Sequence, residues 1–457
     1  MEELPDDVLL EVMSYLGVPD LLACRLVCKR IGELALHPHV WRRQTVDCDK
    51  SSYGRVLRFA PCLGTLIIDF PCRDKELQLY SATRCAVSSL SLHVGRNAPR
   101  DRLLHAAMII RNQEALGRLR ELTVKFHPDR KEGDAYFTLL WTAAYTSGLE
   151  ALTVNILDEA GAVRPAPHLR PQPPCASVKV FQSHLRPELI PFCEFVMAAH
   201  APTIEAVNFY YELFPFGSQT VAPTLSSPTK LASLLAGMPN LRSLLGCPLI
   251  AGLEAVAACE SLREVCLLVG PKGQPAVPAA AEFLHRTKQL RAVSLKYYVE
   301  GGGDVVGDDL VLALVSSGPS SVESLEVQGY GYCYPDMPVR QMLPLSRALP
   351  LMPALKKLTV GMTSREVLLA ITPETNPALR TLELYHGELK DPRCAHHCLH
   401  SDLVVTVLSK NPSLELKVRL AYFCKLCDWC KKGCHREVWG NKVRKAGEWT
   451  TIPRLVD

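Results

Sequence analysis

The chain has 457 residues, more than one compact core usually holds, so we expect two or three structural units or one elongated repeat array. Its composition, 48% hydrophobic and 21% charged, is that of an ordinary globular protein and argues against extensive disorder. The formal net charge of +4 is small for this length and indicates neither nucleic acid nor a membrane surface as a partner.

The sequence shows no membrane or export signal. No apolar run approaches the roughly 18 residues that a spanning helix needs, and the first residues are acidic rather than basic. We therefore expect a protein of the cytoplasm, the nucleus or both. Twelve of the 18 cysteines are scattered singly over the first 393 residues, and in such a chain we expect them to be buried free thiols.

The first 45 residues predict three short helices. One should run over residues 5–16, with acidic residues in its first turn. Asp20 should cap a second helix that continues to about Ile31, and Pro38 should start a third that carries Trp41.

These helices have apolar residues on more than one side. In the first helix the apolar residues spread over about 200°, against the roughly 100° stripe of a helix on a single core. A unit of this size cannot bury that much apolar surface by itself. The surface must therefore meet either the domain that follows or another protein.

The stretch from Leu4 to Trp41 resembles the F-box family over its whole length. The matching residues are Leu4, Pro5, Val8, Leu9, Val12, Leu16, Asp20, Leu21, Val27, Cys28, Lys29 and Trp41, while Asp7 and Ile31 depart from the usual pattern. The resemblance implies that residues 1–45 dock on the Skp adaptor, which connects to a cullin and so to ubiquitin transfer. The residues that it implies for intermodule packing and adaptor contact are Leu4, Pro5, Val8, Leu9, Val12, Leu16, Leu21, Leu26 and Val27.

A six-residue pattern with apolar residues at its first, fourth and sixth positions recurs further along. Clear copies lie at 119–124, 149–154, 204–209, 262–267, 290–295, 322–327, 355–360 and 379–384, and weaker copies begin at Leu63, Val87, Leu241 and Leu414. One copy can arise by chance. Eight copies that alternate with helix-period segments, at 103–116, 135–146, 188–199, 309–315 and 402–408, predict one short strand and one helix per repeat.

This array resembles the leucine-rich-repeat family. The predicted fold class is therefore α/β: a three-helix F-box followed by a leucine-rich-repeat solenoid over 60–420, with irregular, helix-containing repeats. The asparagine or cysteine that usually follows the last strand leucine is missing. Pro-rich or Gly-rich stretches at 164–174, 214–228 and 329–338 predict loops between repeats.

A solenoid of this kind presents the variable strand residues on its inner face, a surface suited to proteins. The candidates for binding a target protein are Lys125, Asn155, Tyr210, Lys296, Glu326 and Tyr385. The alternative for each is that it is merely solvated, since only a minority of interface residues contribute much energy. A tyrosine-rich segment at 330–334 is a second candidate, or a self-packed loop.

The last segment, 421–457, is basic and rich in cysteine and tryptophan. Cys424, Cys427, Cys430 and Cys434 have spacings that suit a structural zinc site or, less well, an iron-sulfur cluster. The same cysteines also suit one apolar face of a helix that caps the repeats, and on this interpretation no cofactor is present. The basic and aromatic residues of this segment form no nucleic-acid-binding motif.

The sequence contains no nucleophile elbow, phosphate loop or metalloprotease motif, so we expect a non-catalytic protein. An F-box joined to leucine-rich repeats resembles the substrate-recognition subunits of Skp-cullin-F-box ubiquitin ligases, which bind a target for ubiquitination by other subunits. The alternative is a leucine-rich-repeat scaffold or inhibitor that binds its partner without ubiquitin transfer.

Overall fold

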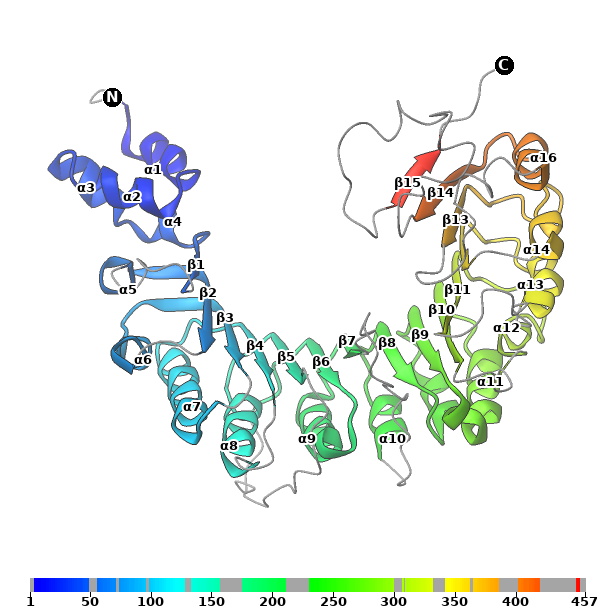
Figure 1. Cartoon of the computed structure of the whole chain (residues 1–457), viewed down its shortest axis with the longest axis horizontal. Coiled ribbons are helices and arrows are strands. Elements are labelled where there is room, and N and C mark those ends of the chain that lie inside the picture. The colour runs from blue at the N-terminus through cyan, green and yellow to red at the C-terminus, as the bar shows by residue number, and fades with distance from the viewer. Residues whose placement is uncertain are drawn as a thin grey trace. The chain divides into compact units, whose positions relative to one another are not determined.

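The computed structural model describes residues 4–48, 56–70, 74–95, 98–127, 133–156, 175–210, 230–299, 306–307, 309–331, 342–361, 365–385, 402–419 and 449–452. The chain divides into two compact units, Met1–Tyr211 and Glu212–Asp457. Each unit is a run of parallel strands joined by helices (Figure 1). Within the described residues, no helix combines the length and the apolar character needed to cross a bilayer.

The first unit begins with four short helices: α1 (Asp6–Ser14), α2 (Val18–Cys24), α3 (Lys29–Ala35) and α4 (Pro38–Trp41). The predicted second helix is thus divided in two by a turn at 25–28, and Asp20 lies in the first turn of α2, whose N-cap is Gly17. Gly32 permits α3 to approach the end of α2, because a Cβ there would lie only 3.0 Å from the Arg25 carbonyl oxygen.

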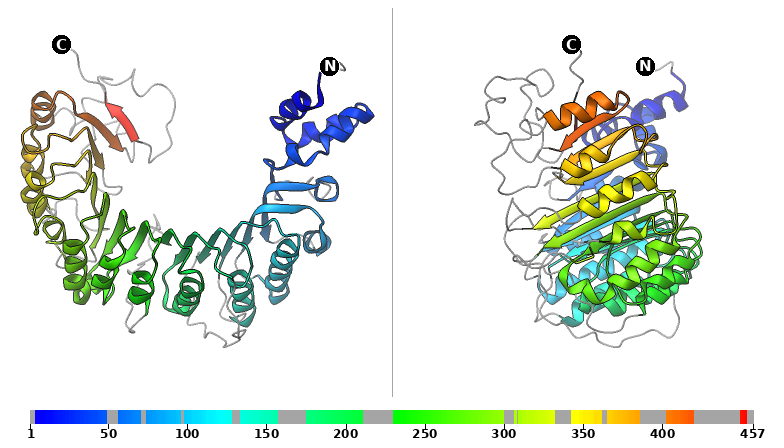
Figure 2. Two further views of the ribbon diagram at one scale, coloured as in Figure 1. Left: turned by 180° about the vertical axis from the view of Figure 1, so that it is seen from behind. Right: turned by 90° about the vertical axis from the view of Figure 1, so that its right-hand side faces the viewer.

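Parallel strands follow in the first unit. They are β1 (Thr45–Asp47), β2 (Cys62–Phe70), β3 (Ala86–Val94), β4 (Glu121–Phe126), β5 (Ala151–Ile156), β6 (Val180–His184) and β7 (Ala206–Tyr210), each paired with the next. The connecting helices are α5 (Val56–Phe59), α6 (Asp74–Ala82), α7 (Arg100–Ala115), α8 (Gly133–Ala144), the 3-10 helix η3 (Pro187–Leu189) and α9 (Ile190–His200). In this unit α6 to α9 lie on one side of the strands (Figures 1 and 2).

The second unit repeats this arrangement. Its strands are β8 (Ser243–Pro248), β9 (Glu264–Val269), β10 (Ala292–Val299), β11 (Ser324–Gly331), β12 (Lys357–Gly361), β13 (Thr381–Tyr385), β14 (Glu415–Arg419) and β15 (Trp449–Ile452). The strands from β8 to β14 pair in parallel, and β15 returns antiparallel along β14. Its helices are α10 (Leu231–Ala236), η4 (Leu253–Ala258), η5 (Pro271–Ala276), α11 (Val277–Arg286), α12 (Leu310–Ala313), α13 (Met342–Ala348), η6 (Leu349–Leu351), α14 (Arg365–Ala370) and α16 (Asp402–Lys410).

The fourth position of the six-residue pattern builds one apolar column in each unit. In the first unit the register pairs Leu66, Leu90, Leu122, Leu152, Phe181 and Val207 in succession. In the second unit it pairs Val265, Val293, Leu325, Leu358 and Leu382, and the column ends in Leu416, the third residue of the last copy, which is one residue shorter. All twelve side chains are buried, so the strands that the pattern predicts do form the core of a leucine-rich-repeat solenoid.

Strand β6 was not among the predicted copies. Its pattern begins with Val178 and Phe181, but the third position is Ser183, which is fully buried. The Ser183 hydroxyl donates to the His184 carbonyl oxygen at 3.3 Å and accepts from the Cys193 thiol at 3.6 Å. A hydrogen-bonded serine therefore occupies a core position that the apolar pattern cannot detect.

Buried polar side chains connect successive repeats in place of the missing asparagine. The Nδ2 atoms of Asn376 and Asn411 donate to carbonyl oxygens of the preceding repeat at 2.7 and 3.1 Å, and the Cys259 thiol does so at 3.2 Å. Each lies three positions before the first leucine of its strand pattern. The side chains that hydrogen-bond one repeat to the preceding one thus lie before the strand, at the end of the helical segment.

The described cysteines are all free, but not all are buried. Six are buried: Cys62, Cys85, Cys193, Cys247, Cys259 and Cys266. Burial raises the pKa of Cys193 and of Cys247 to about 12, so both remain neutral thiols. The prediction of burial is wrong for Cys28 and Cys175, which are exposed, because these two lie outside the helices and strands that stack into the core.

The predicted Pro-rich loops at 164–174 and 214–228 lie outside the described residues, as does most of 329–338. The part of this last stretch that is described, Gly329–Gly331, belongs to strand β11.

Candidate functional site

The first four helices expose a group of large apolar side chains. Leu4, Val8, Val12, Tyr15, Leu26 and Val27 are exposed by 42%, 41%, 54%, 76%, 86% and 68%. Val8 and Val12 of α1 and its C-cap Tyr15 share one face because they are spaced by four and three residues, and Leu26 and Val27 lie in the turn after α2. We call these six residues together the apolar face of the module.

The opposite side of α1 packs inside the module. Leu9 and Met13 are 3% and 4% exposed, Leu21 of α2 is fully buried, and Leu16 is half-buried. Of the residues implied as adaptor contacts, Leu4, Pro5, Val8, Val12, Leu26 and Val27 are therefore exposed. Leu9 and Leu21 serve packing within the chain, the other of the two roles that the resemblance implied.

Polar contacts fix the apolar face in place. The Arg30 guanidinium reaches from α3 to α1, where Nε and Nη2 donate to Asp6 at 2.9 and 2.7 Å and Nη2 donates to the Leu4 carbonyl oxygen. Trp41 is fully buried, and its Nε1 donates to the Ala35 carbonyl oxygen at 2.7 Å. These contacts join the start of α1 to α3 and α3 to α4.

The module is joined directly to the first repeat. The Gln44 side chain donates from Nε2 to the Leu16 carbonyl oxygen at 3.0 Å. The backbone carbonyl oxygen of Gln44 accepts from the backbone amides of Gly64 and Thr65 in β2. A Cβ at Gly64 would lie 2.7 Å from the Arg42 carbonyl oxygen, so this approach requires glycine. On another side, the Arg25 guanidinium lies 3.9 Å above the Phe59 ring of α5. The module is therefore mounted on the repeats rather than tethered to them.

The predicted target-binding residues lie on the strands, and for four of them the strand pairing shows which residue of the next strand lies beside them. Lys125 of β4 and Asn155 of β5 are direct neighbours. In the second unit Lys296 of β10 pairs with Gln328, while Glu326 of β11 pairs with Ser294, whose hydroxyl donates to Glu326 at 2.6 Å. Both pairs are at least half-buried.

Tyr210 and Tyr385, the remaining predicted contacts, end strands β7 and β13. Their side chains lie outside the described part of the chain, as do the tyrosine-rich segment beyond Gly331 and the candidate zinc ligands Cys424, Cys427, Cys430 and Cys434. Target binding by these tyrosines and a zinc site in the tail stay predictions.

Sequence reasoning missed a polar cluster on β2 and β3. The Ser91 hydroxyl lies 3.0 Å from His93 Nε2, and His93 Nδ1 lies 2.5 Å from Asp69 Oδ1. This is the order of groups in a hydrolytic triad, but acyl transfer also needs amide donors for an oxyanion. β3 is paired on both sides, by β2 and β4, so its amides serve the sheet. The geometry supports a polar contact surface at the start of the inner face.

A row of charged residues, one at or directly before the start of each of the strands β4 to β7 and β8 to β14, was also missed. We call it the strand-start row. In the first unit it consists of Arg120, Glu150, Lys179 and Glu205, whose backbones are linked in succession by amide-to-carbonyl hydrogen bonds. The charges alternate in sign along the row. The Glu150 carboxylate lies 2.9 Å from Lys179 Nζ (Oε2) and 3.7 Å from Arg120 Nε (Oε1). The hydrogen bond from Lys179, together with its charge, lowers the pKa of Glu150.

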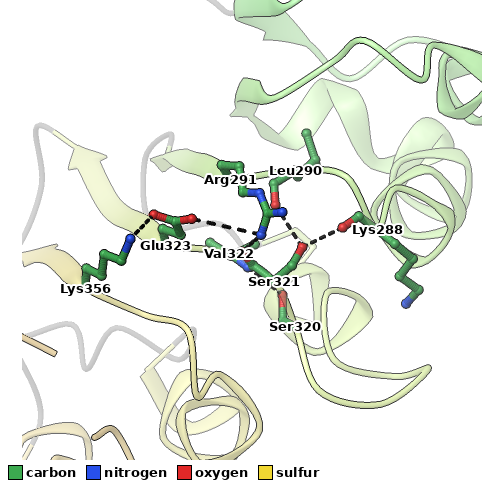
Figure 3. Close-up of polar contacts among 8 residues, drawn as sticks. All are labelled: Lys288, Leu290, Arg291, Ser320, Ser321, Val322, Glu323 and Lys356. Carbon is green, nitrogen blue, oxygen red and sulfur yellow. Dashed lines mark hydrogen bonds and ion pairs between the residues drawn. The ribbon is translucent and has the colours of Figure 1, made fainter. Parts of the chain in front are cut away.

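In the second unit the strand-start row is Arg242, Arg263, Arg291, Glu323, Lys356, Arg380 and Glu415. It carries five cations and two carboxylates. Figure 3 shows Glu323 between Lys356 and Arg291, with nitrogen-to-oxygen distances of 2.5 and 4.0 Å. The hydrogen bond and charge of Lys356, and to a smaller extent Arg291, lower the pKa of Glu323, so it is ionised at neutral pH. The signal in the sequence is the residue after the first leucine of each pattern.

Comparison with known proteins agrees with the module at the start of the chain. Residues 1–47 match the family model for F-box-like modules. Among solved structures, the chain is similar to the leucine-rich repeat-containing protein LegL7 from Legionella pneumophila, with 14% sequence identity and a TM-score of 0.33. That similarity covers 77% of this chain and 93% of LegL7. The repeat architecture rests on the strand register and the buried columns described above.

Proposed function

The chain belongs to the F-box/leucine-rich-repeat proteins, and from this premise we propose that it is the substrate-recognition subunit of a Skp-cullin-F-box ubiquitin ligase. The observation that supports the proposal is the apolar face of the module, exposed on helices whose other sides are packed and hydrogen-bonded. A fixed, exposed apolar surface is costly in water unless a partner covers it. F-box modules bind Skp adaptors, and the adaptor is the occupant that we propose here.

The repeats supply the second half of the proposal. Strands β4 and β5 carry Thr123, Lys125, Thr153 and Asn155 between their buried apolar positions, which gives a polar surface for a target protein. Because the module is mounted on β2 through Gln44, a target bound to the first unit would be held at a defined position relative to the adaptor. In this proposal the chain itself does no chemistry, needs no cofactor and acts in the cytoplasm, the nucleus or both. It promotes transfer by raising the local concentration of target and conjugating enzyme.

Binding to purified Skp adaptor tests the proposal. We expect the full chain to bind, and the triple variant Val8→Asp, Val12→Asp, Leu26→Asp to bind at least about tenfold more weakly, since charges in an apolar contact remain unpaired. Met108 on α7 is 55% exposed and supplies a matched control, Met108→Asp, which should bind like the wild type.

The same preparations separate this proposal from a scaffold or inhibitor role. A ligase subunit should recover Skp adaptor and cullin from cells in proportion to the adaptor affinity of each variant. Recovery of neither protein with the wild-type chain would contradict the proposal and favour a scaffold.

A further inference from the structure

The strand-start rows of the two units differ in the order of their charges, and the stability of the sheet does not explain this difference. Like charges on neighbouring strands repel each other and destabilise a sheet, whereas opposite charges stabilise it. The first unit alternates the sign at each of its four positions, from Arg120 to Glu205. The second unit instead places Arg242, Arg263 and Arg291 on three successive strands.

The cationic side chains of the second row face solvent. Arg242, Arg263 and Arg380 are exposed, and the side chains of Arg291 and Lys356 are 53% and 62% exposed. The six positions from Arg242 to Arg380 are thus a surface feature, with a formal charge of +4 from five cations and Glu323, and Glu415 ends the row. We call these six positions the basic ridge.

Backbone carbonyls hold three of the four arginines of the basic ridge in position. Arg263 Nη1 donates to the Leu262 carbonyl oxygen at 2.9 Å, Arg291 Nη1 donates to that of Ser321 at 3.1 Å, and Arg380 Nη1 donates to that of Pro377 at 2.9 Å. Figure 3 shows this arrangement for Arg291, whose guanidinium lies over the Ser321 backbone. A guanidinium has five N–H donors, and these contacts use Nη1, so they orient the group while its remaining donors suit an external carboxylate.

We propose that the basic ridge binds an extended acidic segment of a partner protein. Neighbouring strands lie about 4.8 Å apart, so the ridge from Arg242 to Arg380 spans roughly 24 Å. An extended peptide of about seven residues covers this length at about 3.3 Å per residue. Carboxylates pair with guanidinium groups in a bidentate manner, which favours the three successive arginines as the centre of binding.

The charge pattern favours a peptide over a nucleic acid. Glu323 interrupts the ridge between Arg291 and Lys356, and Glu264 follows Arg263 at the first position of β9. A phosphodiester backbone has a negative charge at every nucleotide and would meet both carboxylates. A peptide can place neutral residues opposite them. The ridge residues are also not interleaved with aromatic side chains on which bases could stack.

If the acidic partner is the ubiquitination target, this identification rests on the proposed function. Binding of an acidic peptide to the basic ridge does not rest on it. The test uses the full chain by itself and a fluorescein-labelled octapeptide of glutamates with two central serines. Fluorescence anisotropy should show binding that weakens with salt. The same peptide with glutamine in place of glutamate should bind at least about tenfold more weakly, as should a single-stranded RNA octamer.

Three variants locate the site. Arg263→Gln/Arg291→Gln should weaken peptide binding at least about tenfold, since it removes two charge-assisted contacts. Arg120→Gln/Lys179→Gln removes the same charge from the first unit and should change binding less than about twofold. Arg263→Lys/Arg291→Lys also loses the Nη1 contacts but keeps the charge, and it should retain more affinity than the glutamine variant.

Each other result overturns the inference. Equal losses in the two glutamine variants would indicate a general charge effect, and equal losses in the lysine and glutamine variants would indicate a structural role for the arginines. Equal binding of the glutamine peptide, or stronger binding of the RNA, would exclude an acidic peptide as the occupant. Adaptor binding measured on the same samples keeps this outcome separate from failure of the proposed function, because the apolar face of the module is unchanged.

Discussion

The first module and the repeats use the same apolar residue types in opposite ways. On the strands of the second unit, Leu325 and Leu358 are fully buried, because each neighbouring strand carries an apolar residue at the same register. In the module, Val12 and Leu26 are 54% and 86% exposed. A repeat covers the apolar residues of its neighbour, whereas a module present once has no copy to cover it. In the proposed function, the Skp adaptor covers this exposed face.

Core truncation should produce the largest effect and test this comparison most directly. Leu358→Ala on β12 should lower the free energy of unfolding by about 2–5 kcal/mol, since it leaves a cavity between stacked strands. Val12→Ala on α1 should change it by less than about 0.5 kcal/mol. Urea denaturation at neutral pH measures both. Similar losses for the two variants would mean that Val12 belongs to a core, and the comparison would fail.

Acidification should have the next largest effect, and it acts on the repeats. Burial lowers the pKa of His184 and of His200 to about 4, and the Nδ1 atoms of both rings accept backbone amide hydrogens. The unfolded state, with a histidine pKa near 6.5, binds more protons than the folded state between these values. Stability is thus fully present above about pH 6.5 and falls toward pH 4.

Between pH 7 and pH 5 we expect roughly 1–2 kcal/mol to be lost for each of these histidines. Thermal unfolding across this range measures the loss. His200→Asn keeps a hydrogen-bond acceptor without a titrating ring, so it should flatten the pH dependence. An unchanged slope in this variant would show that His200 does not contribute.

The junction between the module and the repeats should be sensitive to a single methyl group. Gly64→Ala places a Cβ 2.7 Å from the Arg42 carbonyl oxygen and should cost about 1–2 kcal/mol through a backbone shift. Gly329→Ala is the matched control, since open space surrounds a Cβ at this position of β11. Limited proteolysis and thermal unfolding should detect loosening in the first variant alone. Equal behaviour would indicate that the module is not mounted through β2.

The smallest expected effect concerns the basic ridge. Glu323→Gln removes the carboxylate between Arg291 and Lys356 and should strengthen binding of the acidic octapeptide about two- to fivefold. Glu150→Gln makes the same change between Arg120 and Lys179 in the first unit and should leave the affinity nearly unchanged. Fluorescence anisotropy at low salt is the appropriate measurement. An equal gain in both variants would place the peptide elsewhere.

The sequence was sufficient to predict most of the repeat strands, because stacking demands an apolar residue at the same three positions of every repeat. It failed at β6, where Ser183 satisfies a core position by hydrogen bonding rather than by hydrophobicity. It also failed to divide the second helix, where the chain turns at 25–28 and Gly32 leaves room for the Arg25 carbonyl oxygen beside α3.

For the candidate site, the sequence by itself determined which residues are apolar, polar or charged and at what spacing they occur. The tertiary structure decided which of them meet. Burial divided the implied adaptor contacts into a packed set that includes Leu9 and an exposed set that includes Val12. The strand register placed Asp69 beside His93, and it aligned the charged residues within each strand-start row. The physical reason is that burial and cross-strand pairing depend on residues some 20 to 35 positions apart, which a local pattern does not contain.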